Sequence, residues 1–333
     1  MSKNALVMLL VLLVSLSGLV FAGGEQEAAA SAEGEAREYE FIYVSHSPNI
    51  NVFQTMREAS NDAAAMIEAA SSDTISIEWT GPDTPGDVNA MKDILETALN
   101  KNPDALMTTT NNPDAYDDVV DKAAARGIPV FTYNIDNPDT ERLAYVGQEF
   151  IPAGITFGNI GIEMMKEQFP NESTYKVAIF TGEAGNYALE RRIEGTREAF
   201  SQDPSIELID VFIYSWDQNE AYNVIGEVFQ KHPDLKGAFG MDAFSEFIGK
   251  YISDNDMQGD VVVGGFDITD QAIEYIKEDA MQYLVGQNTY MQGFMPAVMA
   301  YMYLAENKLP PVIVDTGAPV IKQENIEDAE ISS

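Results

Sequence analysis

The chain has 333 residues, of which 45% are hydrophobic, and a formal net charge of −35 at pH 7. This length is sufficient for two domains of ordinary size. The negative charge would repel nucleic acid and anionic membrane surfaces, so neither is expected as a partner, and we interpret the acidity as a solvated surface. The chain has no cysteine, which excludes disulfides, thiolate metal sites, a catalytic thiol and a lipid-modified cysteine.

Residues 1–22 have the pattern of a signal peptide. Lys3 provides a positive start, an apolar run extends from Ala5 to Phe21, and Val20-Phe21-Ala22 offers the small residues needed for cleavage. A membrane anchor is the alternative, but the run is short for a spanning helix and is broken by Ser and Gly. Residues 23–37 are predicted to be a disordered acidic leader. We therefore expect a protein secreted to the periplasm, or otherwise outside the cytoplasmic membrane, with no lipid anchor.

Strands and helices alternate through the first part of the remaining chain. Strands are predicted at 39–45, 75–79, 105–109 and 128–133, and helices at 53–70, 87–100 and 113–126. Such alternation predicts a parallel sheet covered by helices on both faces.

The second part of the chain repeats this pattern. Strands are predicted at 176–181, 208–214, 238–240, 260–264 and 284–287, and helices at 152–169, 188–200, 217–231, 246–255 and 295–306. The tail at 312–321 is predicted to be extended and could return to the first part.

One passage of eighteen residues occurs twice, 130 positions apart. Residues 87–104 read DVNAMKDILETALNKNPD, and residues 217–234 read DQNEAYNVIGEVFQKHPD. Each opens with Asp-x-Asn, continues with apolar residues at helical spacing and stops at Lys-x-Pro-Asp. Asp87 and Asp217 are predicted to be helix N-caps. The duplication predicts two similar lobes with a cleft between them.

Polar and aromatic side chains follow the predicted strands. In an open parallel sheet, ligands bind outside the carboxyl ends of the strands. The candidate ligand-binding residues are Ser45, His46, Asn51, Phe53, Thr109, Asn134, Asn186, Glu190, Arg192, Trp216, Asp242, Asp267 and Gln287. Carboxylates and amides exchange hydrogen bonds with vicinal hydroxyls, and aromatic faces cover the C–H patches of sugar rings. The set suits a neutral sugar or polyol better than a phosphate, because no P-loop pattern is present.

Several candidates also have a purely structural interpretation. Asp242 could cap the following helix, Asp267 could be a turn residue, and Trp79 is expected in the core. Trp216 lies at a strand end and is expected to stack on the ligand.

The sequence predicts neither an enzyme nor a metal or cofactor site. Its two histidines, His46 and His232, are far apart, and no nucleophile–base motif is present. The alternative is a secreted carbohydrate-active hydrolase that would use two of the carboxylates of Glu190, Asp242 and Asp267.

Short motifs distributed along the chain resemble the periplasmic sugar-binding proteins of ABC importers. They are Tyr43-Val44-Ser45-His46 with Asn51-Val52-Phe53, Gly127-Ile128-Pro129-Val130, Tyr145-Val146-Gly147-Gln148 and Val263-Gly264-Gly265-Phe266-Asp267. Their order and spacing, from about residue 38 to residue 326, are most similar to the ribose-binding branch of the type I binding proteins.

This resemblance implies an α/β fold of two similar, doubly wound parallel-sheet lobes joined by a three-segment hinge, with the ligand cleft between them. It implies an N-terminal lobe of residues 38–147 plus 288–316 and a C-terminal lobe of residues 148–287 plus 317–333. It also implies a monomer that captures a monosaccharide or related polyol by lobe closure and delivers it to the permease subunits of an ABC transporter.

The resemblance also assigns roles to single residues. It matches Ser45, Asn51, Phe53, Thr109 and Asn134 to ligand contacts of the first lobe. In the second lobe it matches Trp216 to a stacking aromatic, Asp242 to a position usually held by an amide, Asp267 to the Asp of a Gly-Phe-Asp motif and Gln287 to a hinge glutamine.

The chain departs from the ribose binders at two places. They carry Asp-Arg where this chain has Asn134-Ile135, and an arginine where it has Glu190. Asn186, Glu190 and Arg192 are more similar to a sister group that handles other sugars and polyols, so ribose is not predicted as the ligand.

Overall fold

The computed structural model describes residues 36–84, 87–110 and 112–328, apart from the side chains of Asn51, Pro113 and Asp328. The predicted signal peptide at 1–22 and residues 23–35 of the predicted leader lie outside this description. Among the helices of the described residues, none has both the length and the apolar composition that crossing a bilayer requires.

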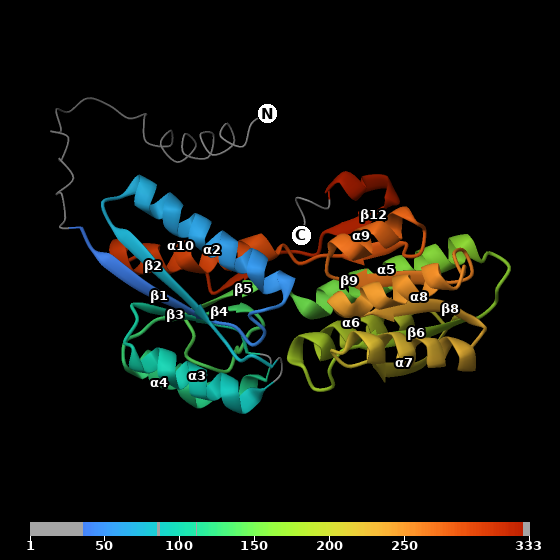
Figure 1. Ribbon diagram of the computed structural model, residues 1–333, viewed down its shortest axis with the longest axis horizontal. Helices are drawn as coiled ribbons and strands as arrows, with labels where there is room; N and C mark the ends of the chain where they lie inside the picture. Colours follow the sequence, from blue (N-terminus) through green and yellow to red (C-terminus); the bar gives the residue numbers. More distant parts are fainter. Residues whose placement is uncertain (1–35, 85–86, 111, 329–333) are drawn as a thin grey trace, which may run out of the picture. The chain divides into compact units, whose positions relative to one another are not determined.

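The first lobe is built on a six-stranded parallel sheet. Its strands are β1 (Glu38–Val44), β2 (Thr74–Thr80), β3 (Ala105–Thr108), β4 (Val130–Asn134), β5 (Ala144–Gly147) and β11 (Ile313–Asp315), in the order β11-β5-β4-β3-β1-β2. Helices α2 (Asn51–Ala70) and α10 (Thr289–Glu306) lie side by side on one face of the sheet. Helices α3 (Val88–Asn100) and α4 (Asp117–Ala125), the latter preceded by the 3-10 turn η1 (Pro113–Ala115), cover the other face (Figure 1).

Strand β1 shows why the strands of this sheet read as apolar runs. Phe41 and Tyr43 pack beneath α2 and α10, whereas Ile42 and Val44 pack beneath α3 and α4. Successive side chains of a strand point to opposite faces, so a strand covered on both sides is apolar throughout.

The second lobe repeats the strand order of the first. Its strands are β6 (Tyr175–Thr181), β7 (Ile206–Ile213), β8 (Leu235–Gly240), β9 (Val262–Phe266), β10 (Tyr283–Val285) and β12 (Val320–Lys322), in the order β12-β10-β9-β8-β6-β7. All pairs are parallel except β10 with β12. The predicted parallel-sheet lobe is confirmed, with this last strand as its one antiparallel member among the described residues. The chain leaves the carboxyl end of β11 and enters β12 only five residues later. β12 therefore starts near the edge at which the other strands of the second sheet end, and it runs antiparallel to them.

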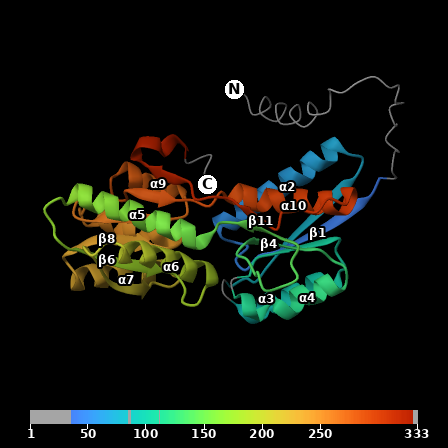
Figure 2. The ribbon, with the colours of Figure 1, turned by 180° about the vertical axis from the view of Figure 1, so that it is seen from behind.

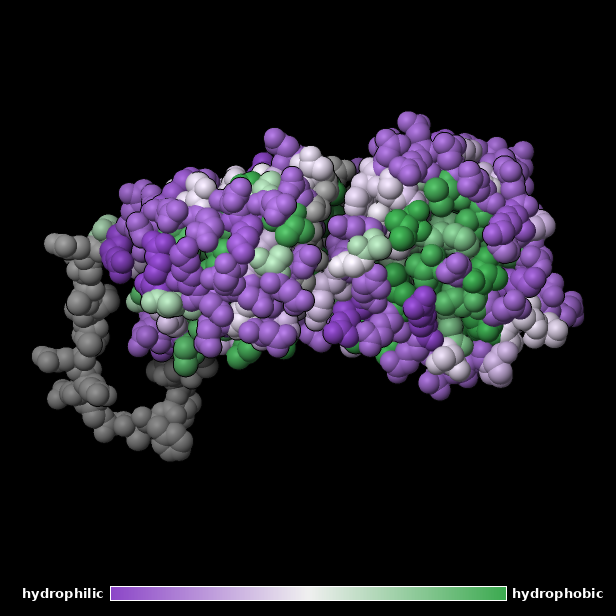
Figure 3. Space-filling view, turned by 90° about the horizontal axis from the view of Figure 1, so that it is seen from below, coloured by the Kyte–Doolittle hydropathy of each residue, from purple (hydrophilic) through white to green (hydrophobic). Residues whose placement is uncertain are grey.

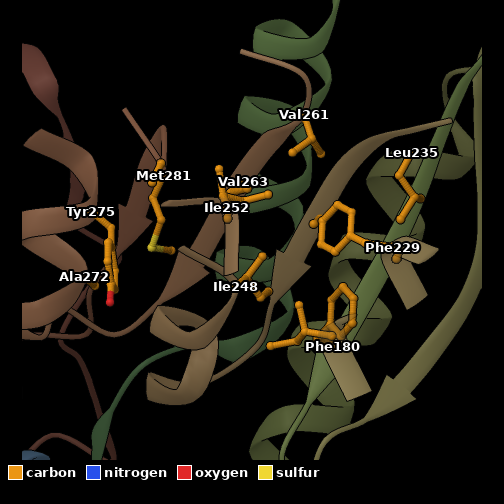
Figure 4. Packing of buried hydrophobic residues seen from close by; sticks show 14 of the residues in the cluster. Phe180, Phe229, Leu235, Ile248, Ile252, Val261, Val263, Ala272, Tyr275 and Met281 are labelled. Atoms are coloured by element: carbon orange, nitrogen blue, oxygen red, sulfur yellow. The ribbon is translucent and has the colours of Figure 1, made fainter. Parts of the chain in front are cut away.

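Helices cover both faces of the second sheet as well. Helices α5 (Phe150–Gln168) and α6 (Tyr187–Ser201) pack together on one face (Figure 2). Helices α7 (Gln218–Lys231), α8 (Glu246–Asp254) and α9 (Asp270–Lys277) cover the other. The 3-10 turns η2 (Ala243–Ser245) and η3 (Gln323–Asp328) complete the lobe. Figure 4 shows how Phe180 of β6 and Phe229 of α7 fill the core beside Ile248 of α8.

The duplicated passage forms α3 in one lobe and α7 in the other, each between the second and third strands of its lobe. Asp87 accepts a hydrogen bond from the N–H of Ala90 at 2.9 Å, and Asp217 accepts one from the N–H of Glu220 at 3.0 Å. Both predicted N-caps are confirmed, and the matching strand orders confirm two similar α/β lobes.

Hydrophilic side chains cover most of the surface seen in Figure 3, beside one broad apolar area on the second lobe. This agrees with the interpretation of the acidity as a solvated surface.

The edge strand β7 carries a register shift opposite Val177 and Ala178, and Asp210 accepts a hydrogen bond from the N–H of Val211 at 2.8 Å. Both features hinder the addition of a further strand at this edge.

Candidate functional site

The carboxyl ends of strands from both sheets border one cavity, which encloses about 640 Å³ of non-protein space including its open mouth. Nine of the thirteen candidate residues line it: His46, Phe53, Asn134, Asn186, Arg192, Trp216, Asp242, Asp267 and Gln287. The cavity therefore brings together side chains that lie more than two hundred residues apart in the sequence.

Ser45, Thr109 and Glu190 do not line the cavity, and the side chain of Asn51 is outside the described part. The side chain of Thr109 is fully buried, and its hydroxyl oxygen lies 3.1 Å from Nδ1 of His46. Ser45 is also buried, and its hydroxyl accepts a hydrogen bond from the N–H of Ser47. Glu190 is exposed and accepts a hydrogen bond from the N–H of Gly185 at 3.0 Å. These three side chains support the loops that line the cavity.

The wall that the first lobe provides is largely apolar. Ile50, Val52, Phe53 and Ile135 line it together with His46 and Asn134. Burial lowers the pKa of His46 to about 3, so its imidazole is neutral at physiological pH. Its ring lies edge to face against Phe53, with 5.0 Å between the centroids.

Asp242 is both a cap and a cavity-lining carboxylate. One oxygen accepts hydrogen bonds from the hydroxyl of Tyr214 at 2.7 Å and from the N–H of Phe244 at 2.9 Å. The other accepts from the N–H of Gly182 at 2.7 Å. Burial raises the pKa of Asp242 to about 6, and these hydrogen bonds oppose the rise. Asp242 is the N-cap of the 3-10 turn η2, whereas α8, the helix that it could have capped, has Ser245 as its N-cap.

Arg192 is a cation held almost entirely inside the protein, 3% exposed. Its nitrogens donate to the carbonyl of Met241 at 2.9 Å and to Oε1 of Gln148 at 3.1 and 3.3 Å. Its guanidinium lies 4.3 Å from the ring centroid of Phe266 and 3.9 Å from Asp267. Burial lowers the pKa of Arg192, which the carboxylates of Asp267 and Asp242 oppose.

A hydrogen-bonded chain connects the two lobes through Gln287. Asn134 of β4 donates to Oε1 of Gln287 at 3.0 Å, and Gln287 in turn donates to the carboxylate of Asp267. Gln292 of α10 also accepts from Asn134, at 3.1 Å.

Three acceptor oxygens at the cavity have no hydrogen-bond donor among the described residues. They are Oδ2 of Asp267, Oδ1 of Asn134 and Oε1 of Glu183. These oxygens can accept hydrogen bonds from a ligand, and hydroxyl groups provide such donors without adding negative charge.

The two tryptophans have different environments. Trp79 stacks on Tyr43 with 4.7 Å between ring centroids and donates to Ser60, which confirms its predicted place in the core. Trp216 lines the cavity and lies edge to face against Phe244, with 5.3 Å between the centroids. Its Nε1 is buried and has no hydrogen-bond partner among the described residues.

Several residues at the site were not predicted. Glu183 follows β6, a predicted strand, so the strand-end rule could have identified it. Phe150 follows β5, which was not predicted, so the rule gave no signal for it. Gln292 lies inside α10 and carries no such signal. Among the described residues, no cluster of His, Asp and Glu is arranged to hold a metal ion.

Residues 41–308 match the family described as the periplasmic binding protein domain, so the chain belongs to this family. It is 26% identical over 312 residues to the xylose/arabinose-binding protein of Sulfolobus acidocaldarius, covering 89% of this chain and 74% of that protein. It is 24% identical over 220 residues to the D-allose-binding periplasmic protein of Escherichia coli, covering 64% of this chain and 70% of that protein.

Among solved structures, an ABC transporter solute-binding protein from Burkholderia graminis in complex with D-arabinose has the same fold. The TM-score is 0.79 at 22% identity, covering 88% of this chain and 98% of that one. A glucose-galactose binding protein from Geobacillus stearothermophilus gives a TM-score of 0.77 at 22% identity, covering 88% and 99%. The predicted family and the predicted two-lobed fold are confirmed.

Proposed function

We propose that this protein is an extracytoplasmic solute-binding protein that captures a monosaccharide or related polyol in the cleft and delivers it to an ABC transporter permease. The observation that carries the proposal is the composition of the cavity. The aromatic rings of Phe53, Phe150 and Trp216 accompany the free acceptor oxygens of Asn134, Glu183 and Asp267. Rings that cover C–H patches and acceptors that receive hydroxyl protons are the contacts a sugar ring requires.

The charges at the cavity favour a neutral ligand over an acidic one. Glu183, Asp242 and Asp267 line it with Arg192 as the cation, while His46 is neutral. The nitrogens of Arg192 are already engaged by Gln148 and Met241. A sugar phosphate or uronate would bring another negative charge beside these carboxylates without a free cation to pair with it.

The named relatives support a sugar ligand, because they bind xylose and arabinose in one case and D-allose in another.

We propose lobe boundaries of 38–147 plus 288–316 and 148–287 plus 317–333. The packing of α10 with α2 and the pairing of β11 with β5 support this division. The hinges would be Gly147-Gln148, Gln287-Asn288 and Thr316-Gly317. We further propose secretion through the signal peptide at 1–22 and function as a monomer.

Two of the three carboxylates of the alternative hydrolase are poorly placed for catalysis. Glu190 lies outside the cavity, and both oxygens of Asp242 accept hydrogen bonds from the protein. General acid–base chemistry on a glycosidic bond needs two carboxyl groups directed at the substrate. A sugar recovered unchanged after prolonged incubation with the protein would support binding without chemistry.

Isothermal titration of the ligand-free protein with pentoses, hexoses and polyols tests the proposal. We expect a sugar that binds with micromolar affinity or better, about −8 kcal/mol or stronger. Asp267→Asn should weaken that affinity at least tenfold, since the free acceptor becomes a weaker one, whereas Asp270→Asn, an exposed residue of α9, should not. Absence of heat across the panel with a folded sample would contradict the proposal.

A further inference from the structure

One part of the cavity lining is a cluster of apolar side chains. Ile135, Phe150 and Ala188 form one buried cluster, with 3%, 7% and 6% of their surfaces exposed, and all three line the cavity. Leu189, 5% exposed, lines the cavity beside Ala188. We call these four residues the apolar corner.

The backbone of the apolar corner has few hydrogen-bonding groups to offer. The N–H groups of Ala188 and Leu189 donate to Oδ1 of Asn186 at 3.1 and 3.4 Å. The N–H of Ile135 donates to Tyr133 at 2.7 Å, and its carbonyl accepts from the N–H and the hydroxyl of Thr110. These groups are committed within the protein.

A cation lies beside the corner, and each of its nitrogens is already bonded to the protein. The guanidinium of Arg192 lies 5.5 Å from the ring centroid of Phe150, and its nitrogens donate to Met241 and Gln148 through three of their five N–H groups. The acceptors without a donor belong to Asn134, Glu183 and Asp267. A ligand in the cavity therefore has hydrogen-bonding partners elsewhere and a purely apolar contact at the corner.

A hydroxyl at the apolar corner would lose its hydrogen bonds to water and gain none from the four side chains of the corner, which is unfavourable. A C–H or methyl group there would instead be favourably buried. Phe150 belongs to the apolar cluster, so with Phe53 and Trp216 on the faces of a sugar the corner would meet its rim. In an aldopyranose, carbons 1 to 4 carry oxygen substituents at the rim. The one rim position without a hydroxyl on a ring carbon is therefore carbon 5 beside the ring oxygen.

Resting on the proposed function, we infer that the ligand turns its carbon-5 edge toward the apolar corner. The ligand class is then a pentopyranose, which has hydrogen there, or a 6-deoxyhexose, which has a methyl group. Hexoses with a free hydroxymethyl group at carbon 5 are disfavoured, because their hydroxyl would be buried against Ile135 and Phe150.

Sugar pairs that differ only at this carbon test the inference by isothermal titration. The pairs are L-arabinose with D-galactose, D-xylose with D-glucose, D-ribose with D-allose and D-lyxose with D-mannose. D-fucose and D-quinovose provide the methyl counterparts of galactose and glucose. In the series that binds best, we expect the pentose or the 6-deoxy sugar to bind about ten- to hundredfold more tightly than the hexose.

A variant with a hydroxyl at the corner links this preference to the site. Ile135→Thr places a hydrogen-bonding group there, so the ratio of the pentose and hexose dissociation constants should shrink at least threefold. Ile128→Thr is the matched control. Ile128 is 8% exposed in the core of the first lobe, does not line the cavity, and should keep the wild-type ratio while losing stability.

The outcomes separate this inference from the proposed function. If the hexose of the best series binds as tightly as its pentose, the inference is overturned while sugar binding stands. The inference also fails if Ile135→Thr still binds sugar but keeps the wild-type ratio. If a folded sample binds no sugar of the panel, both the inference and the proposed function are overturned.

Discussion

Asn134 and Asp267 occupy equivalent positions, and both have left-handed backbone, with φ of 62° and 67°. Asn134 ends β4 and Asp267 follows β9, the third strand from the corresponding edge of each sheet. Asn and Asp adopt this conformation at a lower cost than other non-glycine residues. The strained turn recurs in both lobes, and in both its residue lines the cavity.

Gly182 determines where the ring of Trp216 can lie. A Cβ at this position would lie 2.7 Å from Cη2 of Trp216, closer than carbon atoms can approach. Gly182→Ala should therefore displace the ring and weaken sugar binding by about 1–3 kcal/mol, as Trp216→Ala should. Titration calorimetry measures this loss. In the Trp216→Ala background, Gly182→Ala should have no further effect, and additive losses would show that Gly182 acts by another route.

The carboxyl of Asp242 should make stability depend on pH. Its pKa of about 6 lies above the ordinary 3.8, so the folded protein binds this proton more tightly than the unfolded chain does. Its contribution to stability is then complete below about pH 4 and is lost as the pH rises through 6. The free energy of unfolding of the wild type, relative to Asp242→Asn, should be greater at pH 4 than at pH 7 by about 2 kcal/mol.

Urea unfolding of both proteins between pH 4 and pH 7 measures this difference. His46 has the opposite effect on the pH dependence of stability, because burial lowers its pKa. Glu246 has the same effect as Asp242, because burial raises its pKa. Both groups are present in wild type and variant, so the comparison removes their effects to first order. A difference that stays constant over this range would contradict the assignment.

At the scale of elements, the duplicated helices α3 and α7 are scaffold. Each delivers the chain from the second strand of its lobe to the third, and neither contributes a residue to the cavity lining. Their caps should therefore affect stability alone.

Replacing either cap with alanine should lower the free energy of unfolding by about 0.5–2 kcal/mol, because helix N–H groups lose their acceptor. Asp217→Ala should cost more than Asp87→Ala, since Asp217 accepts from two N–H groups and Asp87 from one. Chemical denaturation measures the loss, and Asp217→Ser should recover most of it. A change in sugar affinity on Asp217→Ala would contradict the role as scaffold.

The elements that the sequence predicted are those buried on both faces or marked by proline and glycine. β1 and β6 read as apolar runs because helices cover both of their faces. Helix α9 has only eight residues and was not predicted, and α10 begins at Thr289 rather than 295 because it continues through Pro296. The antiparallel direction of β12 follows from its entry into the second sheet, which local pattern does not reveal.

At the scale of the whole molecule, Gln148 holds together the three segments that pass between the sheets. It follows β5 on the first segment, and its Nε2 donates to the carbonyls of Gly286 at 2.8 Å and Gly317 at 3.1 Å on the other two. Its Oε1 accepts from the buried Arg192. Gln148 therefore connects the three segments to the cation at the cavity.

Gln148→Met should lower sugar affinity at least tenfold, because Arg192 loses an acceptor and the segments lose their shared donor. Titration calorimetry measures the affinity. Gln282→Met is the matched control, since Gln282 also bonds backbone groups, at Val263 and Asp279, but lies away from the cavity. Both variants should lose stability. An equal effect of the two on sugar affinity would show that Gln148 has a general structural role.

From the sequence, the site residues could be predicted only where they follow a predicted strand. Trp216, Asp242 and Asp267 line the cavity because the carboxyl ends of parallel strands share one edge of a sheet. The rule also selected Thr109 and Glu190, whose side chains turn to other loops. It did not select Gln148, because β5 was not among the predicted strands, or Gln292, which lies inside α10.

A crystal structure of the protein saturated with its best-binding sugar tests the central claim most directly. We predict density for one sugar in the cavity, with a hydroxyl within hydrogen-bonding distance of Asp267, a ring face against Trp216 and the carbon-5 edge toward Ile135. A sugar bound elsewhere on either lobe, with this cavity filled by water alone, would contradict the account.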